Sequence, residues 1–239
     1  MICALVKMAH PVQLELQPRT WGGRRSGAGR KPSGRKVGVP HRTRPAHVAR
    51  HPVHVTLRAA RSLPSLRGDR LFEVLRRGLA QSSRCGLRIL HFSVQTDHVH
   101  MIVEAESGGA LSRGLQGLAI RLAKRVNRAL GRAGSLWSDR YHARPLRTPR
   151  EVRNALVYVL QNWRHHQPGG EGVDPCSSGR WFEAWATNGA SVAGTRPVVP
   201  PRTWLAAVGW RRYGSIKVEE RPADRRGRYG RRRRSGERR

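Results

Sequence analysis

The chain has 239 residues, which suits one domain of ordinary size with flanking segments. Its 47 Lys and Arg residues against 15 Asp and Glu residues give a formal net charge of +32, and a charge of this size favours a polyanionic partner such as DNA. No apolar stretch approaches the roughly 20 residues of a membrane span, and the cysteines have neither the CxxC spacing of a zinc knuckle nor the pattern of a disulfide framework. We therefore expect no membrane partner and a cytoplasmic, nucleoid-associated protein, since the N-terminus also shows no extended apolar segment of the secretory type.

The two ends of the sequence differ in composition from its middle. Residues 1–50 predict a basic flexible arm, because the chain from 19 to 50 is dense in Gly, Pro and Arg and has no hydrophobic period. We expect an extension over 167–220 that is rich in Gly and Pro and contains aromatic segments. It is followed by an Arg-rich disordered tail over 221–239. The folded domain is therefore expected over 51–166.

Within that domain the hydrophobic pattern alternates between the periods of strands and helices. In chain order it predicts a strand over 51–59, a helix over 66–83, strands over 87–95 and 98–105, a helix over 111–130, a strand over 135–146 and a helix from Thr148 to about His166. Thr148, Pro149 and Glu151 have the arrangement of a capping box. The first six elements match the split βαβ order of ferredoxin-like folds. We therefore predict an α+β fold with an antiparallel sheet and one extra C-terminal helix, flanked by basic flexible tails.

Two histidines one residue apart open the third expected strand. Alternate side chains of a strand share a face, so His98 and His100 can reach one metal ion together. Val99 and Met101 would then supply the opposite, core face. Glu104 shares the histidine face further along and is a weaker candidate ligand. Histidines are also common in sheets that bind no metal, and this motif alone leaves that alternative open.

The last expected helix carries a tyrosine away from its apolar side. One helical stripe is apolar and consists of Val152, Ala155, Leu156, Val159, Leu160 and Trp163. A second stripe, nearly opposite, consists of Asn154, Tyr158, Gln161, Asn162 and His165. An aromatic residue on a helix usually belongs to the core, yet Tyr158 is presented beside amide side chains that can bind a metal. This arrangement favours a chemical role for Tyr158.

Together these motifs resemble a known family. The segment DHVHMIVEA, followed by LWSDRYHARPLRTPREVRNALVYVLQN, is similar to the single-tyrosine HUH transposases of the insertion-sequence-200 type. Within that group it is closest to the REP-associated tyrosine transposases. The resemblance implies that His98, His100 and an amide hold a divalent metal, either Mg²⁺ or Mn²⁺. Asn162 lies at the position of that amide, with Gln161 as the reserve, and Tyr158 lies at the position of the nucleophile.

The resemblance also implies a function. It predicts a DNA endonuclease and strand transferase that cleaves single-stranded or hairpin DNA through a 5′-phosphotyrosine and acts in DNA transposition. The residue types suit this chemistry, because a divalent cation offsets charge on the attacked phosphate and a tyrosine ester conserves the broken bond for rejoining. Such ligands would also accept Zn²⁺, but the motifs of zinc deaminases are absent from the sequence. The alternative function is a non-catalytic basic protein that binds DNA or RNA and derives from a transposase.

Six basic residues are predicted to contact the DNA. Four lie on the helix expected over 111–130 and two on the strand expected over 135–146; they are Arg121, Lys124, Arg125 and Arg128, and then Arg140 and Arg144. Tyr141, on the same strand, is predicted to pack or to contact DNA rather than to react. The expected partner is single-stranded or hairpin DNA derived from a repeat, and a homodimer is one assembly to test.

Overall fold

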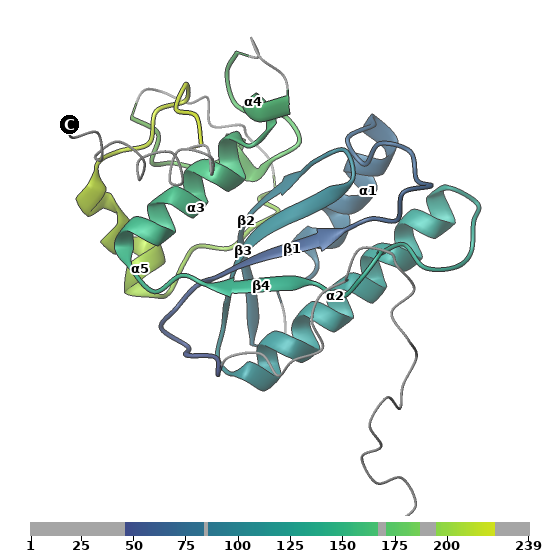
Figure 1. Ribbon diagram of the computed structural model, residues 1–239, viewed down its shortest axis with the longest axis horizontal. Helices are drawn as coiled ribbons and strands as arrows, with labels where there is room; N and C mark the ends of the chain where they lie inside the picture. Colours follow the sequence, from purple (N-terminus) through teal and green to yellow (C-terminus); the bar gives the residue numbers. More distant parts are fainter. Residues whose placement is uncertain (1–45, 84–85, 167–170, 187–194, 223–239) are drawn as a thin grey trace, which may run out of the picture. The chain divides into compact units, whose positions relative to one another are not determined.

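The computed structural model describes residues 46–83, 86–166, 171–186 and 195–222, so most of the predicted N-terminal arm and of the Arg-rich tail lies outside the described residues. Its elements, in chain order, are β1 (Val53–Arg58), α1 (Asp69–Ala80), β2 (Leu87–Val94), β3 (His98–Ala105), α2 (Gly108–Ala129), β4 (His142–Pro145), α3 (Pro149–Gln161), α4 (Trp163–His166), η1 (Ser178–Trp181), α5 (Trp204–Ala207) and η2 (Gly209–Tyr213) (Figure 1). None of the helices described here combines the length and the apolar character that a membrane crossing requires.

The four strands form one antiparallel sheet. Their order is β2-β3-β1-β4, so β1 and β3 are central and each also pairs with an edge strand. Helix α1 connects β1 to β2, and helix α2 connects β3 to β4. This is the order that the split βαβ pattern predicts. The predicted α+β fold with an added C-terminal helix is therefore confirmed.

Strand alternation gives the sheet a core on each face. On one face, Val99 and Met101 of β3 pack with Leu118 of α2 and with α1. On the other face, Ile102 packs with Leu156 of α3. Figure 1 shows α1 and α2 on one side of the sheet and α3 and α5 on the other. Side chains of β3 that alternate with Val99 and Met101 therefore face α3.

Several predicted elements have different bounds in the structure; the helix predicted over 66–83, for example, is α1, Asp69–Ala80. The helix predicted to begin at residue 111 begins at Gly108, because the side chain of Ser107 accepts a hydrogen bond from the Ala110 N–H and caps it. The strand predicted over 135–146 is reduced to β4. Before β4, the indole of Trp137 donates to the carbonyl of Ala119 on α2 at 2.9 Å, so this side chain is anchored on a helix.

The last predicted helix is present but interrupted. The predicted capping box is confirmed: the Glu151 N–H donates to the Thr148 hydroxyl, and the Glu151 carboxylate accepts from the Thr148 N–H, both at 3.2 Å. The helix was predicted to run to about His166, whereas α3 ends at Gln161 and α4 begins at Trp163. At this break, Gln161 is fully buried and donates to the carbonyl of Val218 in the extension.

The described part of the extension packs on the α3 layer. Four of its apolar residues join the core between α3 and the sheet; they are Phe182, Leu205, Trp210 and Ile216. Segments that have no regular hydrophobic period thus complete the second core, and the apolar side of α3 is buried between the sheet and the extension.

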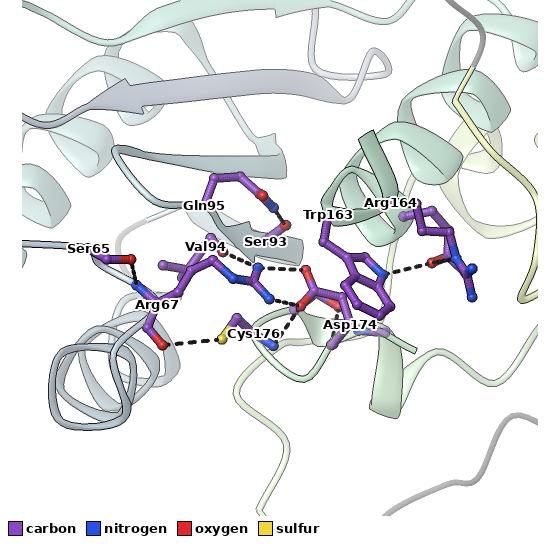
Figure 2. Close-up of polar contacts among 12 residues, drawn as sticks. Ser65, Arg67, Ser93, Val94, Gln95, Trp163, Arg164, Asp174 and Cys176 are labelled. Carbon is purple, nitrogen blue, oxygen red and sulfur yellow. Dashed lines mark hydrogen bonds and ion pairs between the residues drawn. The ribbon is translucent and has the colours of Figure 1, made fainter. Parts of the chain in front are cut away.

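A buried ion pair ties the extension to the segment before α1. Arg67 donates to both carboxylate oxygens of Asp174, at 2.7 and 3.1 Å, and to the carbonyl of Val94 at 2.9 Å (Figure 2). Asp174 is fully buried and also accepts from the N–H of Cys176 at 2.9 Å. Because a forked guanidinium satisfies both carboxylate oxygens, this pair holds a charge that would otherwise be costly to bury.

We expect Asp174→Ala to lower the free energy of unfolding by about 3–5 kcal/mol, because it leaves the charge of Arg67 without its buried partner. Urea denaturation of the full chain measures this change. The control is Glu183→Ala, which breaks an ion pair with Arg196 in which Glu183 is 69% exposed. The control should cost less than about 1 kcal/mol. Equal losses in the two variants would contradict the structural role of Asp174.

Candidate functional site

The two histidines of β3 lie side by side on the face that α3 covers. The ring centroids of His98 and His100 are 4.5 Å apart, with the rings at 80° to each other. His98 is partly exposed, with a side chain 20% accessible, while His100 is buried. The pair therefore offers two imidazoles at one place, one of them open to solvent.

A neighbouring side chain orients each imidazole through its Nδ1 atom. His98 Nδ1 lies 2.6 Å from a carboxylate oxygen of Asp97, and His100 Nδ1 lies 3.0 Å from the hydroxyl of Thr56 on β1. In the tautomers in which Nδ1 donates, each Nε2 carries the lone pair that a metal ligand needs. Histidines that bind metals commonly donate their other ring N–H to an oxygen acceptor such as a carboxylate.

The charge of Asp97 supports this orientation. Burial raises the pKa of its carboxyl, but the hydrogen bond and charge of His98 and then those of Arg58 lower it, so that the pKa lies below its ordinary value. Arg58 donates to the second carboxylate oxygen at 3.0 Å. Asp97 is therefore an anion near neutral pH, able to hold the proton of His98 on Nδ1.

Helix α3 brings Tyr158 to the same place. Its phenol oxygen lies 3.4 Å from His100 Nε2, and the two ring centroids are 4.9 Å apart at 74°. Tyr158 is half-buried, whereas its neighbours Val157 and Val159 are buried in the core. The structure thus brings Tyr158 to the histidine pair, although it follows His100 by 58 residues and His98 by 60 residues in the sequence.

The two candidate amides have different surroundings. Gln161 uses both ends of its amide: it donates to Val218 and accepts from Trp163 Nε1 and Arg164 Nε at 3.4 Å. Asn162 is buried, 3% exposed, and its amide nitrogen has no hydrogen-bond partner among the described residues. A metal would bind Asn162 through its amide oxygen rather than through this nitrogen, and the Asn162 side chain makes fewer hydrogen bonds to the core than that of Gln161. The reserve role of Gln161 stays a prediction that its contacts do not favour.

Glu104 shares the histidine face, as expected, but its carboxylate binds the extension. Its carboxylate accepts from the backbone N–H groups of Arg202 and Thr203 at 2.8–3.1 Å, and the side chain of Arg88 lies 3.6 Å away. These contacts commit the carboxylate to binding the backbone before α5. The part of the chain that the structure describes contains no cluster of three His, Cys, Asp or Glu side chains able to hold an ion.

Sequence reasoning missed a third histidine at the site. The ring centroid of His54, on β1, lies 5.3 Å from that of His100 and 5.6 Å from that of Tyr158. In the register of β1 with β3, Thr56 pairs with His100 and His54 pairs with Ile102. The alternation in HPVHVTL places His54 and Thr56 on one face, but only the strand order reveals that this face is the one with His100.

The predicted DNA contacts divide between the two layers. Four of the six residues lie on α2, across the sheet from Tyr158; they are Arg121, Lys124, Arg125 and Arg128. Of these, Arg125 is half-buried and donates to Gln81, and the other three are exposed. The other two residues follow α2 in the chain: Arg140 is exposed, and Arg144 of β4 lies 3.1 Å from Glu151. Tyr141 is buried in the core with α1 and α2, which agrees with the predicted packing role.

Comparison with known proteins identifies the domain. Residues 47–162 match the family model described as "Transposase IS200 like". The match includes both strand histidines and Tyr158 and ends at Asn162. This part of the chain belongs to the IS200-like transposase family. The family expected from the histidine and tyrosine motifs is therefore confirmed.

A solved structure shares the fold of this transposase domain. The chain resembles a REP-associated tyrosine transposase bound to a REP hairpin, with a TM-score of 0.50 and 18% sequence identity, over 64% of this chain and 92% of that chain. At this identity the likeness establishes the fold alone. Among curated proteins, none matches the chain.

Proposed function

We propose that the chain is a tyrosine transposase that cleaves and rejoins single-stranded or hairpin DNA with Tyr158 as its nucleophile. The observation that carries this proposal is the 3.4 Å approach of the Tyr158 phenol to His100 in a domain of the transposase family. Tyr158 borders the core formed by α3, but its ring also contacts the rings of His54 and His100, which packing alone does not require.

The bond changes follow from the residue types. The phenol oxygen of Tyr158 attacks the scissile phosphorus, forming a bond from tyrosine to the 5′-phosphate and breaking the bond from phosphorus to the 3′ oxygen. The phenol gives its proton to water, and the leaving 3′ oxygen takes a proton from water. The attack of a 3′-hydroxyl on the phosphotyrosine reverses these steps and rejoins a strand. No energy source beyond the broken bond is needed.

The donor set fits the divalent metal that the family resemblance implies. Two imidazoles with Nδ1 already engaged would hold the ion through His98 and His100, and the amide oxygen of the buried Asn162 is proposed as the third donor. When bound, Mg²⁺ or Mn²⁺ would polarise a phosphate oxygen and offset its charge during the attack. Asp97 and Thr56 keep the two imidazoles in the required orientation, and Tyr158 is held beside them by α3.

DNA is the proposed partner on two grounds. The net charge of +32 favours a phosphate backbone, and the solved structure that shares the fold is described as bound to a REP hairpin. The basic residues of α2 and the Arg-rich tail are proposed to contribute to this binding without taking part in the chemistry.

The test is the detection of a covalent protein–DNA adduct. The full chain is incubated with Mn²⁺ and a pool of labelled hairpin oligonucleotides that have randomised single-stranded flanks. We expect a labelled adduct that survives a denaturing gel and maps to Tyr158 by peptide mass analysis. Mapping to Tyr141 would overturn the mechanism, and binding without any adduct would favour the non-catalytic alternative.

A further inference from the structure

A cavity of about 190 Å³ opens beside Tyr158. The rings of His54 and Tyr158 line it, together with Asn154 of α3 and Arg144 of β4. Apolar surface comes from Leu146 and from other residues of α3. Because this cavity is smaller than the roughly 300–1,000 Å³ that drug-sized ligands occupy, it suits a group of about the size of one nucleobase.

The far wall of the cavity belongs to the C-terminal segment 214–222, here called the strap. Arg153 of α3 clamps the strap: it donates to the carbonyls of Gly214 and Ser215 at 3.0 and 2.9 Å and to both carboxylate oxygens of Glu220 at 2.6 and 2.9 Å. Its side chain is 16% exposed. Figure 1 shows this last described part of the chain, in yellow, beside α3. The clamp holds Arg221 and the rest of the strap at the cavity.

The charges around the cavity favour an anion at its rim. Glu151 lies 3.1 Å from Arg144, and Glu220 pairs with Arg153, so these two carboxylates offset two of the guanidinium groups. Arg221, which also lines the cavity, is exposed and adds a positive charge beyond those two pairs. A nucleotide has the matching chemistry, since its base is flat and largely apolar on its faces while its phosphate is anionic.

We propose that this cavity binds one unpaired nucleotide that adjoins the scissile phosphate, with the base inside the cavity and a flanking phosphate at Arg221. The cavity shares the ring of the proposed nucleophile, so a strand that presents its phosphate to Tyr158 must place a neighbouring nucleotide near this opening. The strap then acts as a specificity-determining wall of the site. The inference rests on the proposed function, because the nucleotide is part of the strand that Tyr158 would attack.

Base removal tests the cavity by binding alone. The hairpin that the full chain binds most tightly is selected from the randomised pool, and each flanking nucleotide in turn is replaced by an abasic unit. Dissociation constants are measured by fluorescence anisotropy with Mn²⁺ and the full-length Tyr158→Phe protein, which keeps the ring and cannot form the ester. We expect one position at which loss of the base weakens binding about tenfold, the size of effect that base stacking produces.

A matched pair of variants assigns that position to the cavity. Asn154→Trp fills the opening from an exposed position of α3 and should weaken binding about tenfold. The abasic substitution should then cause no further loss, because the two changes remove the same contact. Gln116→Trp, an equally large change of an exposed amide on α2, should leave the abasic effect unaltered, because α2 lies across the sheet from the cavity.

The outcomes separate this proposal from the proposed function. If the wild-type chain forms the adduct but the abasic scan is flat, or Asn154→Trp behaves like Gln116→Trp, the cavity proposal fails and the cleavage mechanism stands. If no adduct forms but Asn154→Trp abolishes the position-specific effect, the cavity proposal holds for a protein that binds without cleaving.

Discussion

Tyr158→Phe should abolish strand cleavage and adduct formation, by at least about a thousandfold, while DNA affinity stays within about twofold of the wild type. The substitution removes one oxygen atom, the one that lies 3.4 Å from His100 Nε2. The ring contacts with His54 and His100 are kept. Gel assays of cleavage, paired with anisotropy measurements of binding, separate the loss of chemistry from any loss of affinity.

Tyr141→Phe is the matched control for this loss. Tyr141 is buried in the core formed with α1 and α2, on the sheet face opposite Tyr158. Removing its hydroxyl should therefore leave cleavage and the adduct near the wild-type level. Undiminished cleavage by Tyr158→Phe, or loss of the adduct in Tyr141→Phe alone, would show that the nucleophile has been assigned to the wrong tyrosine.

The order of the elements could be predicted because each carries its own local period. The alternation in HVHMIVEA predicts both the strand and its two faces, and the structure places Val99 and Met101 on one side and His100 on the other. Boundaries that depend on distant contacts could not be predicted. Residues 135–141 have the composition of a strand, yet the indole of Trp137 is anchored on α2, its backbone forms only an isolated bridge with Ala59, and the continuous strand is His142–Pro145.

The candidate site shows the same limit. His98, His100 and Tyr158 could be proposed from strand and helix geometry, because each lies on a face that its own element defines. His54 and Thr56 come from another strand, and their position beside His100 depends on the pairing of β1 with β3. The position of the strap could not be predicted from the sequence, because no hydrophobic period in residues 214–222 indicates that Arg153 holds it against α3.

Removal of the metal, or of either histidine that would bind it, is expected to stop cleavage while the domain stays folded. EDTA should abolish adduct formation, and added Mg²⁺ or Mn²⁺ should restore it. His98→Ala and His100→Ala should each lower the cleavage rate about 10²–10³-fold, the range found when a group that stabilises transition-state charge is lost. Titration with Mn²⁺, followed by calorimetry, should show weaker metal binding in both variants.

Two further variants show whether these losses reflect the metal. Asp97→Asn keeps both imidazoles but weakens the carboxylate contact to His98 Nδ1, so we expect an intermediate loss of about 10–100-fold in metal affinity. His47→Ala removes a histidine that bonds to the carbonyl of Ala105, at the far end of β3. It should leave metal binding and cleavage unaltered.

The metal assignment rests on the order of these effects. Loss of a carboxylate that only orients an imidazole must weaken metal binding less than loss of the imidazole itself. Loss of a histidine away from the pair must leave metal binding unchanged. Full cleavage in EDTA, or metal affinity in His98→Ala and His100→Ala equal to that of His47→Ala, would remove the ion from the mechanism. Tyr158 would then have to act beside two histidines whose role is to bind the phosphate directly.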